Sequence, residues 1–117
     1  MRAVAVLLFL LAGEAFASPL YSFKVSVSAY CPCAICCGKW SKHGLTKSGQ
    51  RPTPRHTIAA DPHVFPIGSC ISISGVRYVV EDVGSAIKGK RIDIFHGSHE
   101  AAVKFGRQEL IVTFCKE

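Results

Sequence analysis

The sequence predicts a small, mainly β domain of the barrel type, with one short helix and a cysteine-rich loop. Three observations lead to this prediction. Short apolar segments recur along the chain between glycine- and proline-containing turns, several of them alternating with a period of two. One segment near the C-terminus carries the start and stop signals of a helix. A stretch without periodicity near residue 35 holds four of the six cysteines.

The first residues have the features of an export signal. A basic residue is followed by an apolar run over residues 3–12, and Ala15 and Ala17 are small residues suited to cleavage. The apolar run is about half as long as a membrane-spanning helix requires. We therefore expect a signal peptide over residues 1–17 and one mature domain over residues 18–117, secreted or periplasmic and not associated with a membrane after cleavage.

The first half of the mature chain predicts two strands separated by a long loop. Apolar and polar residues alternate strictly over residues 22–29, as in a half-buried strand. Residues 30–57 contain most of the cysteines and several glycines and prolines, so we expect a loop there. Residues 58–60 predict a short strand that ends at Asp61-Pro62, because proline cannot donate to a strand ladder.

The second half predicts a hairpin, a further strand, the helix and a closing strand. The expected strands cover residues 70–74, 76–81, 92–95 and 108–115. The first two meet at Gly75, with a bulge or a longer turn between them. Ser98 is a suitable helix N-cap and Gly106 a natural terminator, so the helix is expected between them. The closing strand is apolar enough on both sides to be central.

An even number of cysteines behind an export signal favours disulfides. The six are Cys31, Cys33, Cys36, Cys37, Cys70 and Cys115. They allow 15 pairings. The first four could instead bind zinc as thiolates, although they lack two separate two-cysteine knuckles. His96 and His99 are three residues apart without a clear third ligand. We expect disulfides, no metal and no cofactor.

The net charge of +6 limits the classes of partner. The basic residues are scattered, which fits simple solubility as well as a polyanionic partner. Nucleic acid is a poor partner for an exported protein, whereas cell-wall polymers carry suitable carboxylates and phosphates. No glycine-rich loop joins a strand to a helix as nucleotide binding requires. We expect a monomer.

The chain has three aspartates, Asp61, Asp82 and Asp93, each at the edge of an expected strand beside a turn. Such positions hold a carboxylate rigidly and leave it accessible, as an acid or base requires. Aspartates also favour turns for purely structural reasons. Asp93 differs because it lies between Ile92 and Ile94, and alternation sends it to the opposite face.

The segments around these aspartates resemble the bacterial 3D domain, which is named for three aspartates. The segments are residues 46–49, 58–62, 65–68 and 81–93. The eleven-residue offset from Asp82 to Asp93, with Ala86-Ile87-Lys88-Gly89 between them, is also similar to the catalytic segment of membrane-bound lytic transglycosylase A. The resemblance covers nearly the whole mature chain.

The resemblance implies a double-psi β-barrel that cleaves the MurNAc–GlcNAc bond of peptidoglycan and forms a 1,6-anhydro sugar. By position, Asp93 matches the catalytic acid, and Asp82 and Asp61 match supporting aspartates. A lytic transglycosylase uses the C6 hydroxyl of the sugar as nucleophile, so one residue can act as acid and then as base. Such an acid needs a pKa above the ordinary value of about 3.9. Burial and a nearby aspartate would both raise it.

Five further residues are candidates for substrate binding. Lys88 and Arg91 suit the peptide carboxylates or the lactyl ether, and Thr46, Ser48 and Tyr30 suit sugar hydroxyls. Two other functions stay open. The domain could be a noncatalytic module that binds peptidoglycan or another polysaccharide, or it could hydrolyse a β-1,4-glucan, because fold analogy alone does not separate these activities.

Overall fold

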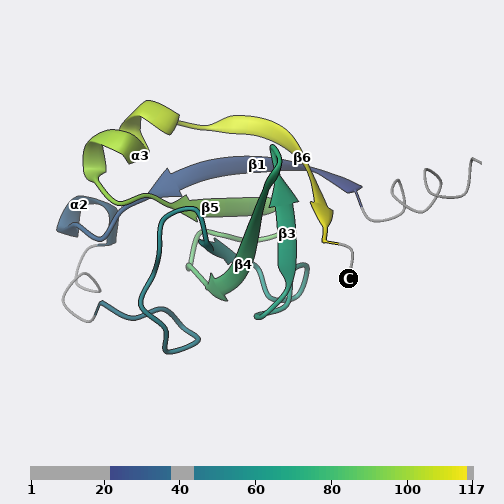
Figure 1. Cartoon of the computed structure of the whole chain (residues 1–117), viewed down its shortest axis with the longest axis horizontal. Helices are drawn as coiled ribbons and strands as arrows, with labels where there is room; N and C mark the ends of the chain where they lie inside the picture. The colour runs from purple at the N-terminus through teal and green to yellow at the C-terminus, as the bar shows by residue number, and fades with distance from the viewer. Residues whose placement is uncertain (1–21, 38–43, 116–117) are drawn as a thin grey trace, which may run out of the picture.

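The computed structural model describes residues 22–37 and 44–115. The expected signal peptide, residues 1–17, and the side chain of Cys36 lie outside what it describes. The strands are β1 (Ser22–Tyr30), β2 (Thr57–Ala60), β3 (Cys70–Ile73), β4 (Val76–Asp82), β5 (Arg91–Phe95) and β6 (Gln108–Phe114). They close into a barrel in the order β1-β5-β2-β4-β3-β6 (Figure 1).

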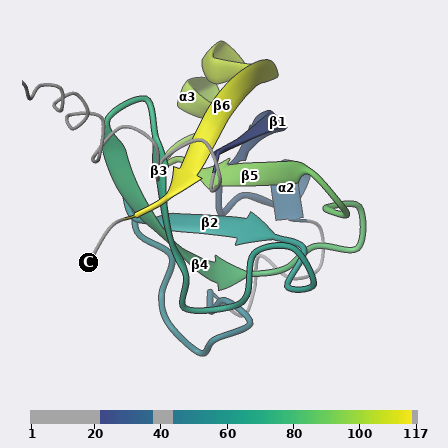
Figure 2. The same cartoon turned by 90° about the vertical axis from the view of Figure 1, so that its right-hand side faces the viewer.

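The barrel contains two parallel strand pairs joined by antiparallel ones. β1 pairs with β5 and β2 pairs with β4 in parallel, while β2 and β5 are antiparallel. Figure 2 shows β2 between β5 and β4. Closure gives every strand two neighbours, which satisfies the backbone groups that an open edge would leave exposed. The predicted class, a small double-psi β-barrel with one short helix and a cysteine-rich loop, is confirmed.

The core follows from the alternation that the sequence shows. Inward-facing aliphatic residues of the strands form one cluster with Phe65, and each buried side chain of this kind contributes about 1.5–3 kcal/mol. The cluster consists of Val25, Val27, Ile58, Ala60, Phe65, Ile71, Ile73, Tyr78, Val80, Ile92, Ile94 and Val112. Phe23 and Phe114 pack against Phe65 with ring centroids at 5.6 and 5.7 Å. The residues that alternate with this set point away from the core.

The hairpin turn agrees with the expectation of a longer connection, whereas the last strand differs from the sequence-based expectation at one position. β3 and β4 are joined by the two-residue turn Ser74-Gly75, in which both residues have positive φ, 51° and 81°. This is the turn geometry that matches strand twist. The turn is one residue longer than the single Gly75 between the expected strands, so the expected longer turn is confirmed, and the β3–β4 register contains no bulge. β6 has two neighbouring strands, as expected of a central strand, but Ile111 on its outer face is 61% exposed.

One short helix and one isolated helical turn flank the barrel. α3 (His99–Phe105) begins after Ser98, whose hydroxyl accepts a hydrogen bond from the backbone of Ala101, and ends at Gly106 with φ 68°. Such a cap contributes about 1 kcal/mol. The expected long loop contains a single helical turn, α2 (Ala34–Cys37). Within residues 22–37 and 44–115, no helix is long and apolar enough to cross a membrane.

One disulfide joins Cys70 at the start of β3 to Cys115 after β6, with Cα atoms 5.3 Å apart. The two strands are neighbours, and the backbone of Cys115 donates to the carbonyl of Cys70. The bond closes a loop with a sequence separation of 45 residues. Restricting a loop of this length in the unfolded chain stabilises the fold by about 4 kcal/mol. The expectation of disulfides is confirmed for this pair.

Candidate active site

The strand register aligns two of the three aspartates across neighbouring strands. Asp93 on β5 pairs with Ser28 on β1 and with Ala59 on β2. Ala59 in turn pairs with Asp82 on β4, because a register shift between Ile58 and Ala59 skips Glu81. Residues paired in this way project from the same face of a sheet. Ile92 and Ile94 beside Asp93 are buried in the core, so this face is the outside of the barrel. The alternation therefore explains how a carboxylate fits inside an apolar strand.

Asp93 lies in a partly buried position that favours its protonated form. Burial raises the pKa of Asp93 above its ordinary value. The hydroxyl of Ser28, which donates to Oδ1 of Asp93 at 3.0 Å, opposes this rise, as do the positive charges of Arg91, Arg107 and His96. Of the two causes that the sequence suggested, burial sets the direction. A raised pKa favours the protonated carboxyl group that a general acid requires.

Asp82 is fixed by three hydrogen bonds. Its Oδ1 accepts from the backbone N–H of Lys47 at 3.0 Å and from that of Val83 at 2.9 Å. Its Oδ2 accepts from the hydroxyl of Tyr30 at 3.2 Å. Asp82 is therefore an oriented acceptor whose position depends on the loop before β2 and on the end of β1.

Tyr30 connects the environments of both carboxylates. Its pKa is raised by burial and then by the nearby charges of Asp82 and, more weakly, Asp93. The phenol consequently remains a hydrogen-bond donor at physiological pH. Its ring packs edgewise on Phe95 at 5.3 Å, and its carbonyl accepts from the backbone of His96 at 2.6 Å. The structure thus places Tyr30, a predicted substrate ligand, beside the two candidate acids.

Asp61 occupies a different environment directly after β2. Its Oδ2 accepts from the backbone of Gly89 at 2.9 Å, and its Oδ1 accepts from the backbone of His63 at 3.0 Å. These bonds, that of Gly89 first, lower the pKa of Asp61 to about 2. Gly89 has a φ of 69°, which favours glycine. Asp61 therefore holds the turn that precedes β5.

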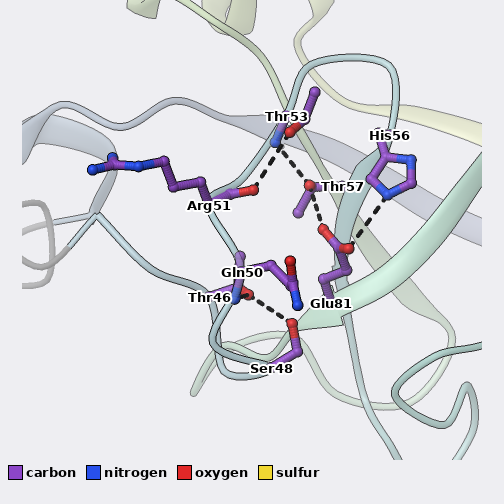
Figure 3. Close-up of polar contacts among 8 residues, drawn as sticks. All are labelled: Thr46, Ser48, Gln50, Arg51, Thr53, His56, Thr57 and Glu81. Carbon is purple, nitrogen blue, oxygen red and sulfur yellow. Dashed lines mark hydrogen bonds and ion pairs between the residues drawn. The ribbon is translucent and has the colours of Figure 1, made fainter.

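Polar contacts hold the loop before β2 together and connect its end to Glu81 on β4 (Figure 3). The hydroxyls of Thr46 and Ser48 lie 2.9 Å apart and bind each other, and the backbone of Ser48 donates to the carbonyl of Glu81. Glu81 in turn accepts from the hydroxyl of Thr57 at 2.7 Å and lies 3.3 Å from His56. Thr46 is buried and shapes this loop, whereas Ser48 is exposed.

The two basic candidates lie in different surroundings. Arg91 donates to the carbonyl of Ala86 at 2.8 Å, and its charge acts on Asp93, so it belongs to the site. Lys88 is exposed on the turn before β5. Sequence reasoning missed Ser28, although its place on the polar face of the first strand pattern was a usable signal. It also missed Arg107, which acts on Asp93 from beyond α3 and has no local pattern that points to the site.

A group of potential metal ligands lies at the end of β1. The sulfurs of Cys31 and Cys33 and the ring of His99 are within 4.8 Å of one another. The aspartates do not form such a group with other ligand residues among residues 22–37 and 44–115. The site therefore offers acid–base chemistry on β5 and β4, and a separate set of sulfur and nitrogen ligands nearby.

Residues 56–116 match the family model of the 3D domain, which is more than half of the chain. The chain belongs to the 3D domain family. The resemblance predicted from the aspartate segments is thereby confirmed. Relatives of this chain include the putative cell wall shaping protein YabE of Bacillus subtilis, which is 37% identical over 86 residues. Another is the cell wall-binding protein YocH of the same organism, which is 42% identical over 50 residues. These matches cover 72% and 42% of this chain.

The matched parts of this chain span only about a fifth of the length of these relatives, 20% and 17%. Among solved structures it is similar to MltA from Escherichia coli, whose crystal structure is described as a lytic transglycosylase fold. The TM-score is 0.53 at 26% identity, over 62% of this chain and 27% of MltA. MltA with bound chitohexaose gives a TM-score of 0.52 at 25% identity over the same shares. The barrel is thus part of a larger protein in each comparison.

Proposed function

We propose that this 3D domain cleaves the MurNAc–GlcNAc bond of peptidoglycan as a lytic transglycosylase and leaves 1,6-anhydroMurNAc ends. The observation that carries the proposal is Asp93, a partly buried carboxyl group of raised pKa in one register row with Asp82. The likeness to MltA and to two cell-wall proteins supports the same class of substrate. The proposal rests on this chain's own carboxylates together with that likeness.

The proposed reaction requires one dominant acid. Asp93 donates its proton to O4 of the leaving GlcNAc while the bond from that oxygen to C1 of MurNAc breaks. The C6 hydroxyl of MurNAc then forms the new bond to C1 and gives its proton to Asp93, which restores the starting state. Ordinary glycoside hydrolysis would instead need a second carboxylate to attack or to activate water.

The other two aspartates have supporting roles in this proposal. Asp82, held by Tyr30 and the backbone of Lys47, supplies a fixed negative charge next to the row of Asp93 that stabilises the positive character developing at C1. Asp61 positions the turn at Gly89 and thereby the start of β5. Neither role requires a proton transfer.

Substrate contacts are proposed for the remaining candidates. Arg91 and Lys88 would bind the peptide carboxylates or the lactyl ether, and Ser48 and Tyr30 would contact sugar hydroxyls. Thr46 would act through Ser48, because its own hydroxyl is buried and engaged. The net charge of +6 suits an anionic wall polymer. We propose that the mature domain, residues 18–117, acts outside the cytoplasm as a monomer on glycan strands.

Product analysis tests the proposal. The purified exported protein is incubated with peptidoglycan, and the soluble fragments are identified by mass spectrometry. We expect anhydro ends from the wild type and from Glu109→Gln, a control that removes an exposed carboxylate on β6. Asp93→Asn should release almost nothing. Reducing ends from the wild type would show hydrolysis instead.

A noncatalytic wall-binding module is the second candidate, and the likeness to the cell wall-binding protein YocH favours it specifically. It predicts that the wild type and Asp93→Asn co-sediment with peptidoglycan to the same extent and that neither releases fragments. The enzyme proposal predicts equal co-sedimentation but release by the wild type alone. One sedimentation experiment with analysis of the supernatant separates the two candidates.

A further inference from the structure

Two cysteines and a histidine from distant parts of the chain converge beside the end of β1. The sulfurs of Cys31 and Cys33 lie 3.0 Å apart, and Nδ1 of His99 lies 3.8 and 3.6 Å from them. Cys31 is fully buried, and the other two residues are partly buried. These three atoms come from a loop and a helix separated by 66 residues.

The spacing resembles three corners of a tetrahedral zinc site. With Zn–S of about 2.3 Å and Zn–N of about 2.0–2.1 Å, a tetrahedron has S···N edges of about 3.6 Å and S···S edges of about 3.8 Å. Both observed sulfur–nitrogen distances fit these edges. On metal binding the two sulfurs would move apart by about 0.8 Å. At 3.0 Å they are well beyond the bond length of a disulfide, which is about 2.05 Å.

The surrounding fold holds each ligand in place. Cys31 directly follows β1, and His99 is the first residue of α3, whose start is fixed by the capping hydroxyl of Ser98. The thiol of Cys37 donates to the carbonyl of Cys31 at 3.0 Å, which turns the α2 segment back onto the end of β1. Figure 1 shows α2 and α3 at the same end of the barrel, where β1 ends.

We propose that Cys31, Cys33 and His99 bind one Zn²⁺ ion, which has a structural role. Binding converts two thiols to thiolates and releases two protons to solvent, and the neutral imidazole binds through Nδ1. Two thiolates balance the charge of the ion. The fourth position of the tetrahedron is left to a further ligand. The ion ties the cysteine-rich loop to α3 immediately after Tyr30, the residue that bonds Asp82.

Metal analysis of the full chain tests this proposal. The protein is expressed with export in zinc-supplemented medium, dialysed and measured by inductively coupled plasma mass spectrometry. We expect about one zinc per chain in the wild type. Loss of an outer-shell partner lowers metal affinity by about 10–100-fold. Cys33→Ser and His99→Ala each remove a direct ligand and should therefore lower zinc affinity by more than this. Glu100→Gln is the matched control and should keep its zinc, because Glu100 is an exposed residue of α3 next to His99 and lies outside the ligand group.

Cobalt substitution identifies the ligands in protein that remains folded. Co²⁺ in the wild type should give the intense visible bands of a tetrahedral site and a thiolate charge-transfer band in the near ultraviolet. His99→Cys should retain the metal and strengthen that band, because a third thiolate replaces the imidazole. A wild type that takes up neither metal, with Cys31 and Cys33 recovered as a disulfide in peptide mapping, would overturn the proposal. Neither readout depends on glycan cleavage, so the result is independent of the proposed enzyme activity.

Discussion

Asp61 and Asp93 belong to the same set of three aspartates, yet the fold gives them opposite surroundings. Asp61 accepts two backbone hydrogen bonds at a strand end, which lower its pKa to about 2. Asp93 lies within a strand, partly buried, and its pKa is raised. The first environment preserves a charge that organises a turn, and the second favours a proton that can be transferred. Position relative to the strand end therefore separates a structural carboxylate from a candidate acid.

The largest effect should come from Asp93→Asn. The amide keeps an acceptor for Ser28 but cannot donate the proton, so release of glycan fragments should fall by about 10²–10⁴-fold. Stability at pH 7 should be unchanged or slightly higher, because the variant removes a charge that burial disfavours. Fragment release and thermal unfolding are measured on the same sample. Retained release would assign the acid role elsewhere.

Tyr30→Phe should have the next largest effect. The substitution removes the hydroxyl that donates to Asp82 and leaves the edgewise contact with Phe95 in place. Loss of a hydrogen bond to a charged group of about 1.5–3 kcal/mol corresponds to a rate decrease of about 10–100-fold. Initial rates of fragment release measure it. An unchanged rate would show that Tyr30 and Asp82 do not cooperate.

Asp61→Asn should lower activity by about tenfold, because Asp61 holds the turn at Gly89 that positions β5. The effect of this substitution on stability is more diagnostic. The folded pKa of Asp61 lies below the ordinary value of 3.8, so its contribution is present above that pH and is lost as pH falls toward about 2. Urea unfolding from pH 7 to pH 2 should show the wild type more stable at pH 7 and the difference shrinking below pH 4.

Asp93 should show the opposite sign in the same titration. Its folded pKa is raised, so its contribution to stability falls as pH rises from the unfolded to the folded pKa and is constant above it. The stability of Asp93→Asn relative to the wild type should therefore increase through this range. Parallel curves for the two variants would contradict the contrast between these aspartates.

Ser28→Ala should have the smallest effect on rate, about fivefold for a hydrogen bond of about 1 kcal/mol. Its informative readout is the pH–rate profile. The hydroxyl of Ser28 lowers the pKa of Asp93, so removing it should raise that pKa further. A general acid loses activity as pH rises through its pKa, and the alkaline limb should move to higher pH. A shift to lower pH would place another group in the acid role.

Much of the fold was predictable because apolar and polar residues alternate along several of its strands. Every strand expected from the sequence is present, and Ser98 and Gly106 bound the helix as expected. The sequence left a bulge or a longer turn open at Gly75, and the structure has the longer turn, Ser74-Gly75. The type of turn was not predictable, because a serine in the left-handed conformation has no sequence signature as strong as glycine's. Ile111 was misread because an isolated exposed aliphatic residue looks like a core residue in sequence.

The site was predictable only in part. The aspartates stand out by number and position, but their different surroundings depend on register and on contacts across the chain. Tyr30 reaches Asp82 over 52 residues, and His99 reaches Cys33 over 66 residues. Pairings of such sequence separation arise from barrel closure rather than from local pattern. The sequence suggested burial and a neighbouring aspartate as causes of a raised pKa of Asp93, and of these two it is burial that raises the pKa in the structure.

The most direct test of the central claim is digestion of peptidoglycan in water enriched in ¹⁸O. A single acid that activates the sugar's own C6 hydroxyl forms the anhydro ring without water. Mass spectrometry should therefore find anhydroMurNAc ends that carry no ¹⁸O, and these ends should disappear with Asp93→Asn. Ends that carry one ¹⁸O would show that water attacks C1, and would contradict the assignment of Asp93 as the acid of a lytic transglycosylase.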